Sequence, residues 1–217
     1  MRRNVLFGLA ALAGAALLPT VPALAQSAAP AATIDVKAAT AERVVGSPNA
    51  KITIIEYSSF TCPHCADFHE KTWPRLKADF VDTGQVRMIF RDYPLNGPAL
   101  AAAMLARCVP AERYEGMSAA IFKSLRVWAA NPDPIKGLQQ IARLAGMSDA
   151  TFQACLSNEE LKQSVAQSRL TGTEKYKVAS TPSFFFNEGK EKIEGAAPYE
   201  DFVKVLEKLG AKKPPAK

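Results

Sequence analysis

Two cysteines separated by a proline and a histidine follow closely on a β-branched stretch of the chain. Residues 51–57 read KITIIEY, and residues 62–65 read CPHC. The β-branched stretch predicts a buried strand over 51–57. Proline is favoured in the first turn of a helix, so a helix is expected from about Pro63. Such a helix would place Cys62 at its positive N-terminal end and Cys65 one turn later on the same face.

A cysteine pair of this kind could be a zinc site, a copper-carrying loop, a structural disulfide or a redox centre. Zinc needs further ligands, but only His64 and His69 lie nearby, and the sequence has no second C-x-x-C. A disulfide that closes so small a loop stabilises a fold poorly. Free backbone N–H groups and the helix dipole stabilise a thiolate at Cys62. We therefore favour a redox-active pair with no metal and no other cofactor, while the alternatives stay open.

The N-terminus has the features of a cleavable export signal. Two arginines precede an uncharged stretch over residues 5–18, and Ala23-Leu24-Ala25 offers a peptidase site before Gln26. The apolar stretch is shorter than a membrane-spanning helix requires, which disfavours the alternative of a retained anchor. We expect a signal peptide over 1–25, exported by the general or the twin-arginine route, and a mature chain outside the cytoplasm.

Charge and cysteine content fit an exported protein of about 190 residues with one core. Residues 1–25 hold two arginines and no acidic residue, so their removal lowers the net charge from +6 to +4, which gives no case for nucleic-acid binding. Besides the C-x-x-C pair, the chain has Cys108 and Cys155, both among apolar neighbours. In an oxidising compartment we expect a structural Cys108–Cys155 disulfide; two separate buried thiols are the alternative.

The remaining sequence predicts two α/β segments around a helical block. We expect a flexible leader over 26–42, a first α/β part over 43–98 and a helical block of four or five helices over 99–177. A second α/β part is expected over 178–210, and residues 211–217 form a tail. Predicted elements are a second strand over 85–93, a helix interrupted or restarted at Pro74, strands over 183–187 and near 192–193, and a helix over 199–209.

These motifs together resemble the DsbA-type thiol:disulfide interchange proteins. The resemblance rests on FTCPHC at 60–65, the helical block, and VASTPSFF at 178–185, and it covers about residues 42–210. It implies an α/β thioredoxin-like fold with an inserted all-helical subdomain, and a periplasmic location. The activity that it implies is donation of the Cys62–Cys65 disulfide to folding exported proteins.

The resemblance also assigns roles to individual residues. Cys62 corresponds to the exposed nucleophile and Cys65 to the partly buried resolving thiol. Pro63 and His64 lie between them, and the histidine is expected to stabilise the thiolate, with a plain solvent-facing position as the alternative. We expect the side chain of His69 to face solvent.

Three further residues belong to the predicted site. Thr181 and Pro182 correspond to a loop beside the disulfide in which the proline is cis. Glu56 corresponds to an acidic residue that relays protons to the buried thiol, and its alternative is a carboxylate at a strand edge facing water.

One residue departs from the pattern of the strong oxidases. Thr181 stands where the best-known oxidases carry valine and where isomerases and several other exported branches of the family carry threonine. A periplasmic isomerase or reductase, similar to the DsbC/DsbG class or to copper-resistance relatives, is therefore the second hypothesis, and a non-catalytic chaperone is the third. About 25 residues between Gln26 and Lys51 are too few for a separate dimerisation domain, so we expect a monomer. The implied partners are unfolded exported proteins with free thiols and a membrane-bound DsbB-type protein that restores the disulfide.

Overall fold

The computed structural model describes residues 33–213. The expected signal peptide, residues 26–32 of the leader and the last four residues lie outside this range. The strands are β1 (Arg43–Val45), β2 (Ile52–Ser58), β3 (Val86–Asp92), β4 (Ser183–Phe186) and β5 (Glu191–Glu194). The α-helices are α1 (Val36–Thr40), α2 (Pro63–Asp67), α3 (Trp73–Leu76), α4 (Gly97–Arg107), α5 (Tyr114–Lys123), α6 (Leu125–Trp128), α7 (Pro134–Leu144), α8 (Asp149–Leu156), α9 (Glu159–Glu174) and α10 (Tyr199–Lys208).

The five strands form one mixed sheet in the order β1-β3-β2-β4-β5. Strands β2 and β3 are parallel because a helical crossover joins them, and the other neighbours pair antiparallel. Strand β2 therefore lies in the middle of the sheet, paired on both sides. Its burial on both faces is consistent with the isoleucines and the tyrosine of this segment.

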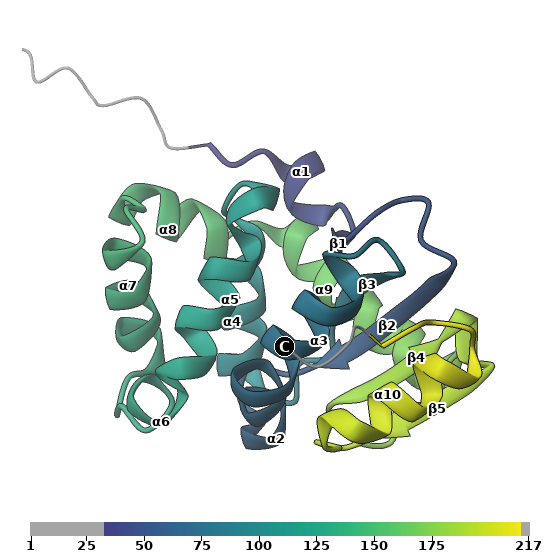
Figure 1. Ribbon diagram of the computed structural model, residues 1–217. Helices are drawn as coiled ribbons and strands as arrows, with labels where there is room; N and C mark the ends of the chain where they lie inside the picture. The colour runs from purple at the N-terminus through teal and green to yellow at the C-terminus, as the bar shows by residue number, and fades with distance from the viewer. Residues whose placement is uncertain (1–32, 214–217) are drawn as a thin grey trace, which may run out of the picture. The chain divides into compact units, whose positions relative to one another are not determined.

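The two faces of the sheet bury different side chains. Phe184 and Phe186 of β4 join the main core beneath the helices that begin at Pro63 and beneath α10, whereas Phe185 joins a smaller cluster on the other face. Side chains alternate along a strand, so successive phenylalanines serve the two faces in turn. Helix α9 packs against β3, and Figure 1 shows it across the sheet from α2 and α3.

The crossover between β2 and β3 is one helical stretch with two irregular turns. Helix α2 leads into a π-helical turn, Phe68–Thr72, then α3 and a second π-helical turn, Lys77–Val81. Pro74 lies in the first turn of α3. Proline cannot donate a backbone hydrogen bond to the preceding turn, so the wider turn before α3 accommodates it. The expected interruption near Pro74 takes the form of this π-helical turn, and the helical stretch continues through the proline without a new start.

Helices α4 to α9 form an insertion between β3 and β4, beside the sheet in Figure 1. The structure has six α-helices here, so the expectation of four or five was wrong. Ser124 divides α5 from α6, since its hydroxyl donates to the carbonyl of Ala120 at 2.6 Å and competes with the helical backbone bond. Cys108 and Cys155 form a disulfide that ties the end of α4 to α8, with a Cα–Cα distance of 6.1 Å.

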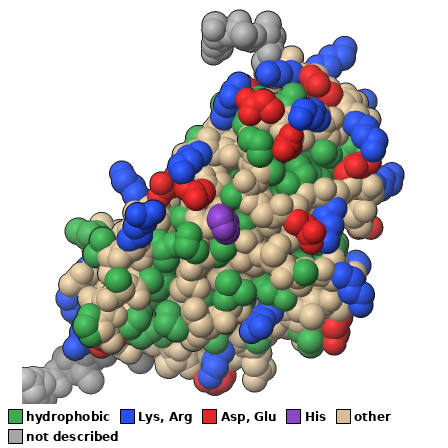
Figure 2. All heavy atoms as spheres, turned by 90° about the horizontal axis from the view of Figure 1, so that it is seen from below, with side chains coloured by type: hydrophobic (Ala, Val, Ile, Leu, Met, Phe, Trp, Pro, Cys, Tyr) green, Lys and Arg blue, Asp and Glu red, His purple; other side chains and the backbone are tan. Residues whose placement is uncertain are grey.

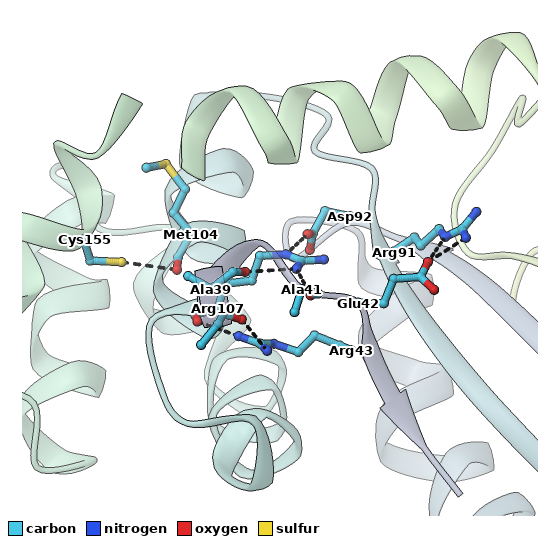
Figure 3. Close-up of polar contacts among 10 residues, drawn as sticks. Ala39, Ala41, Glu42, Arg43, Arg91, Asp92, Met104, Arg107 and Cys155 are labelled. Carbon is cyan, nitrogen blue, oxygen red and sulfur yellow. Dashed lines mark hydrogen bonds and ion pairs between the residues drawn. The ribbon is translucent and has the colours of Figure 1, made fainter. Parts of the chain in front are cut away.

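Two buried arginines hold the segment that precedes β2 (Figure 3). Arg43 of β1 donates to the carbonyls of Ala38 at 2.9 Å and of Arg107 at 2.7 Å. Arg107 of α4 forms a buried ion pair with Asp92 and donates to the carbonyl of Ala41 at 3.0 Å. The prediction that the leader stays flexible up to residue 42 is therefore wrong for residues 36–42, because their carbonyl groups are bound by these guanidinium groups.

Two short elements, α1 and β1, were not predicted. Strand β1 contains three residues and α1 five, which is too short for hydrophobic periodicity to identify either. No helix in the described part of the chain is long and apolar enough to cross a membrane.

Candidate active site

Cys62 is the N-cap residue, immediately before α2, and no side chain caps this helix. Its backbone is extended, and its carbonyl accepts from the N–H groups of Cys65 at 3.1 Å and Ala66 at 3.2 Å. The hydroxyl of Thr61, the residue before Cys62, contacts Asn96 Oδ1 at 3.4 Å and does not cap the helix. Pro63 has no N–H, so the first free N–H of α2 is that of His64, which donates to the Cys62 sulfur.

The loop before β4 brings Thr181 and Pro182 to Cys62. The Thr181–Pro182 peptide bond is cis, and the Cys62 thiol donates to the carbonyl oxygen of Thr181 at 3.2 Å. Pairing of β4 with β2 fixes this position, since Ser183 lies opposite Tyr57 in the register. The structure thus joins two predicted site segments that are 119 residues apart in the chain.

The reduced site strongly favours a thiolate at Cys62. A hydrogen bond from the Cys65 thiol is the main cause, and it lowers the pKa of Cys62 to about 5. Burial opposes this shift, because a thiolate loses hydration, whereas the side chain of Thr181 and the backbone N–H groups of Cys65 and His64 lower the pKa further. Cys62 therefore carries the nucleophilic thiolate near neutral pH.

Cys65 has the opposite character. Burial raises the pKa of Cys65 well above its ordinary value, and the Cys62 thiolate and the charge of Glu56 raise it further. Cys65 is fully buried, and Cys62 exposes only 7% of its surface. Both cysteines are thus more buried than predicted, because the cis-proline loop covers one and the strand β2 the other.

Glu56 is fully buried under the active site. It lies in the central strand β2, so the alternative of a strand-edge carboxylate facing water is wrong. Its Oε1 lies 3.0 Å from Nε2 of His69, and its Oε2 has no hydrogen-bond partner among the described residues. The relay role that the resemblance assigns to Glu56 stays a prediction, and its position near Cys65 is compatible with that role.

His69 does not face solvent as predicted. Its side chain is 9% exposed and stacks on Phe122, with ring centroids 4.4 Å apart. The sequence contained a signal that was missed: Cys65, Phe68 and His69 have the i, i+3, i+4 spacing of one helix face, and Cys65 was expected to be buried. A histidine on that face must be buried as well, with a polar partner.

His64 and Pro63 are both exposed at the start of α2. The backbone N–H of His64 contributes to the low pKa of Cys62, while the role of its imidazole stays a prediction. Figure 2 shows a surface histidine with apolar side chains on one side and acidic and basic side chains on another. In residues 33–213, no three His, Cys, Asp or Glu side chains are grouped as metal ligands.

Proteins of known structure share this fold. A family model described as thioredoxin matches residues 38–208. The crystal structure of Wolbachia pipientis alpha-DsbA1 superposes with a TM-score of 0.72 and 32% identity over 77% of this chain and 90% of that chain. The chain is a DsbA-like member of the thioredoxin family. Its helical insertion between β3 and β4 is the DsbA arrangement, so the predicted fold class is confirmed.

Two further proteins similar to this chain are named as enzymes that act on disulfides. It is 30% identical over 147 residues to the "Putative protein-disulfide oxidoreductase" of Rickettsia bellii, covering 67% of this chain and 57% of that protein. The chain thus spans little more than half the length of this curated relative. A structure titled protein-disulfide isomerase, from Novosphingobium aromaticivorans, has a TM-score of 0.67 and 25% identity over 78% of this chain and 98% of that one.

Proposed function

We propose that this DsbA-like protein is an oxidase that donates its Cys62–Cys65 disulfide to exported proteins. The observation that carries the proposal is the difference between the two thiols: the pKa of Cys62 is lowered to about 5, and that of Cys65 is raised. A low pKa at Cys62 stabilises the reduced site and makes Cys62 a good leaving group. Both effects favour transfer of electrons from substrate thiols to the site.

The reaction follows from these properties in two exchanges. A substrate thiolate attacks the Cys62 sulfur, the Cys62–Cys65 bond breaks, and Cys65 leaves and takes up a proton because it is buried. A second substrate thiolate then attacks the substrate sulfur that is bonded to Cys62. The substrate disulfide forms, Cys62 leaves as its stabilised thiolate, and two electrons have passed to the protein.

The substrates and partners in this proposal are those of an exported oxidase. Unfolded proteins with free thiols would contact the apolar side chains that lie on one side of the surface histidine in Figure 2. The N-terminal signal features support a periplasmic location. A membrane-bound DsbB-type protein would reoxidise Cys62 and Cys65, and the protein would act as a monomer.

A disulfide isomerase is the second candidate function. Thr181 favours it, since isomerases carry threonine before the cis-proline, and the Novosphingobium relative is titled an isomerase. Refolding of scrambled ribonuclease distinguishes the two activities, because an oxidase acts on reduced ribonuclease and leaves the scrambled form largely inactive. A chaperone without redox activity is disfavoured by the asymmetric thiol pair.

Trapping of mixed disulfides tests the assigned thiol roles. Cys65→Ala leaves Cys62 without its resolving partner, so we expect disulfide-linked complexes with reduced substrate proteins on non-reducing gels. The matched variant Cys62→Ala should form few complexes and lose activity on reduced ribonuclease. Complexes that depend on Cys65 would contradict the proposed function.

A further inference from the structure

Glu56 and His69 form a buried pair between the active site and another part of the surface. Glu56 and Ser58 lie on the face of β2 that packs beneath the helix carrying Cys65 and His69, since side chains alternate along a strand. The Glu56 Oε1 contacts His69 Nε2 at 3.0 Å, and its Oε2 has no partner among the described side chains. The inner end of this pair is thus a carboxyl oxygen without a partner among the described residues, on the strand face beneath the active-site helix.

The other member of the pair, His69, reaches a surface cavity away from Cys62. His69 lines a cavity of about 340 Å³ together with Trp73, Tyr114 and Ser118, among others. None of the residues that line this cavity belongs to the C-x-x-C motif or to the cis-proline loop. His69 therefore lies between the buried carboxylate and a surface cavity that a bound substrate at Cys62 would leave open.

We propose that His69 is the outer member of a proton relay that connects Cys65, through Glu56, to solvent at this cavity. The proposal rests on the proposed function and extends it, because the resemblance assigns a proton role only to the acidic residue. Imidazole can accept a proton on one nitrogen and release one from the other, and its charge ordinarily changes between pH 5 and 8. An imidazole bonded to a carboxylate is placed for this transfer.

The proton balance of the first exchange shows what the relay does. When the substrate thiolate bonds to Cys62, Cys65 leaves as a buried thiolate, which is costly without a proton. His69 gives a proton to Glu56, Glu56 passes it to Cys65, and His69 takes up a replacement proton from solvent in the cavity. In the reverse direction Cys65 loses its proton along the same path.

The other charged side chains near His69 are bound to partners of their own, and Glu56 is the charged group that contacts its ring. Helix α5 presents Tyr114 and Glu115 to the cavity, and the turn after α3 presents Lys77. The Glu115 carboxylate accepts from Trp73 Nε1 at 3.1 Å, and Lys77 pairs with Asp82 at 2.7 Å. The remaining faces of the ring are covered by Phe68, Phe90 and Phe122.

Reduction of the Cys62–Cys65 disulfide by dithiothreitol measures the relay without any protein substrate. The protein is mixed with dithiothreitol at pH values from 5 to 8, quenched in acid, and the alkylatable Cys65 is quantified. His69→Gln keeps an amide that can bond to Glu56 but cannot carry a proton at these pH values, and Glu56→Gln is the corresponding inner variant. We expect each to reduce at least about tenfold more slowly than the wild type at pH 7.

The double variant and the pH profile separate a relay from simple packing. If both residues pass the same proton, either substitution alone already blocks the transfer. The double variant Glu56→Gln with His69→Gln should therefore be no slower than either single variant. The ratio of wild-type to His69→Gln rates should change across pH 5–8. A His69→Gln rate equal to the wild type, a loss that is constant with pH, or losses that multiply in the double variant would each overturn the relay.

Chemical rescue supplies a second test if the glutamine variants fold poorly. His69→Gly opens the cavity toward Glu56, and added imidazole should restore reduction toward the wild-type rate. The matched control, His69→Gly with Glu56→Gln, should not respond beyond the effect of imidazole on the wild type. Equal rescue in both variants overturns the relay. A wild-type protein in which dithiothreitol and glutathione do not exchange with Cys62 would instead contradict the proposed function.

Discussion

At the scale of single residues, two chemically identical thiols, three positions apart in the chain, have opposite pKa shifts. Cys62 faces the uncapped end of α2, whereas Cys65 lies beneath it, between the helix and β2, close enough for the Glu56 charge to act on it. The first environment stabilises a thiolate and the second a thiol. This division makes the lowered pKa of Cys62 a property of the fold rather than of the tetrapeptide.

The stability of the reduced protein should therefore depend on pH. The pKa of Cys62 is lowered to about 5 from an ordinary value of 9.0, so its stabilising contribution is fully present above the unfolded pKa and is lost as pH falls through about 5. At pH 7 this is at most about 3 kcal/mol. The raised pKa of Cys65 lowers the stability of the reduced protein, but only at pH values above the pKa of an unfolded cysteine.

Urea unfolding of the reduced and oxidised forms measures this effect. We expect the reduced protein to unfold at higher urea at pH 7, with a gap that narrows toward pH 5. The comparison is made in the Cys108→Ala/Cys155→Ala background, so that only the Cys62–Cys65 pair changes its redox state. An oxidised form that is the more stable at pH 7, or a gap that is unchanged between pH 5 and pH 8, contradicts the thiolate assignment.

The sequence was sufficient for the residues whose role follows from a local motif. Cys62, Cys65 and the Thr181-Pro182 pair were found because a C-x-x-C at a strand-to-helix junction and a resembling loop are local patterns. The partner of Glu56 was not found, since a hydrogen bond between β2 and the following helix depends on how the two pack. The burial of Cys62 was underestimated for the same reason, because it requires the distant cis-proline loop.

At the scale of elements, one glycine lets α9 approach the sheet. A Cβ on Gly172 would lie 2.8 Å from the Tyr57 ring and 3.1 Å from the Tyr93 ring, which is closer than van der Waals contact. Strand β2, which carries Tyr57 and Glu56, is thereby covered on the face opposite to the active-site helix. The strands β2 and β3 were predicted because their apolar runs are long, whereas no pattern in the sequence indicates which helical residue must be small.

Gly172→Ala should destabilise the protein although alanine is the better helix former. We expect a loss of about 1–3 kcal/mol in the free energy of unfolding, because the added methyl group displaces the two tyrosine rings. Gly116→Ala in α5 is the matched control, since a Cβ there meets nothing within 4 Å. It should stabilise by up to about 1 kcal/mol. Urea titrations of both variants test this, and a stabilising Gly172→Ala would refute the close approach.

At the scale of the whole described fold, the helical insertion has its own covalent tie. The Cys108–Cys155 disulfide joins positions 47 residues apart, from the end of α4 to α8. Its Cys155 sulfur is fully buried and lies 3.2 Å from the carbonyl oxygen of Met104 (Figure 3). A disulfide sulfur has no proton to donate, so this contact reflects packing, and the bond acts mainly on the unfolded chain.

Loss of this disulfide should lower stability without removing the active site. On the chain-entropy model, Cys108→Ala with Cys155→Ala costs about 4 kcal/mol in the free energy of unfolding. Calorimetry or urea titration measures the loss, and the pKa of Cys62, followed by thiolate absorbance, should remain near 5. A variant as stable as the wild type would show that the tie contributes nothing to the fold.

The redox equilibrium with glutathione tests the central claim most directly. The pKa of about 5 at Cys62 lies between the values of about 7 for thioredoxin and about 3.5 for DsbA. The protein is equilibrated over a range of glutathione ratios, and the reduced fraction of Cys62–Cys65 is measured by alkylation and mass spectrometry. An oxidase with this site should have a reduction potential between about −200 and −120 mV, whereas a value near the −270 mV of thioredoxin, or any value below about −200 mV, would contradict the account.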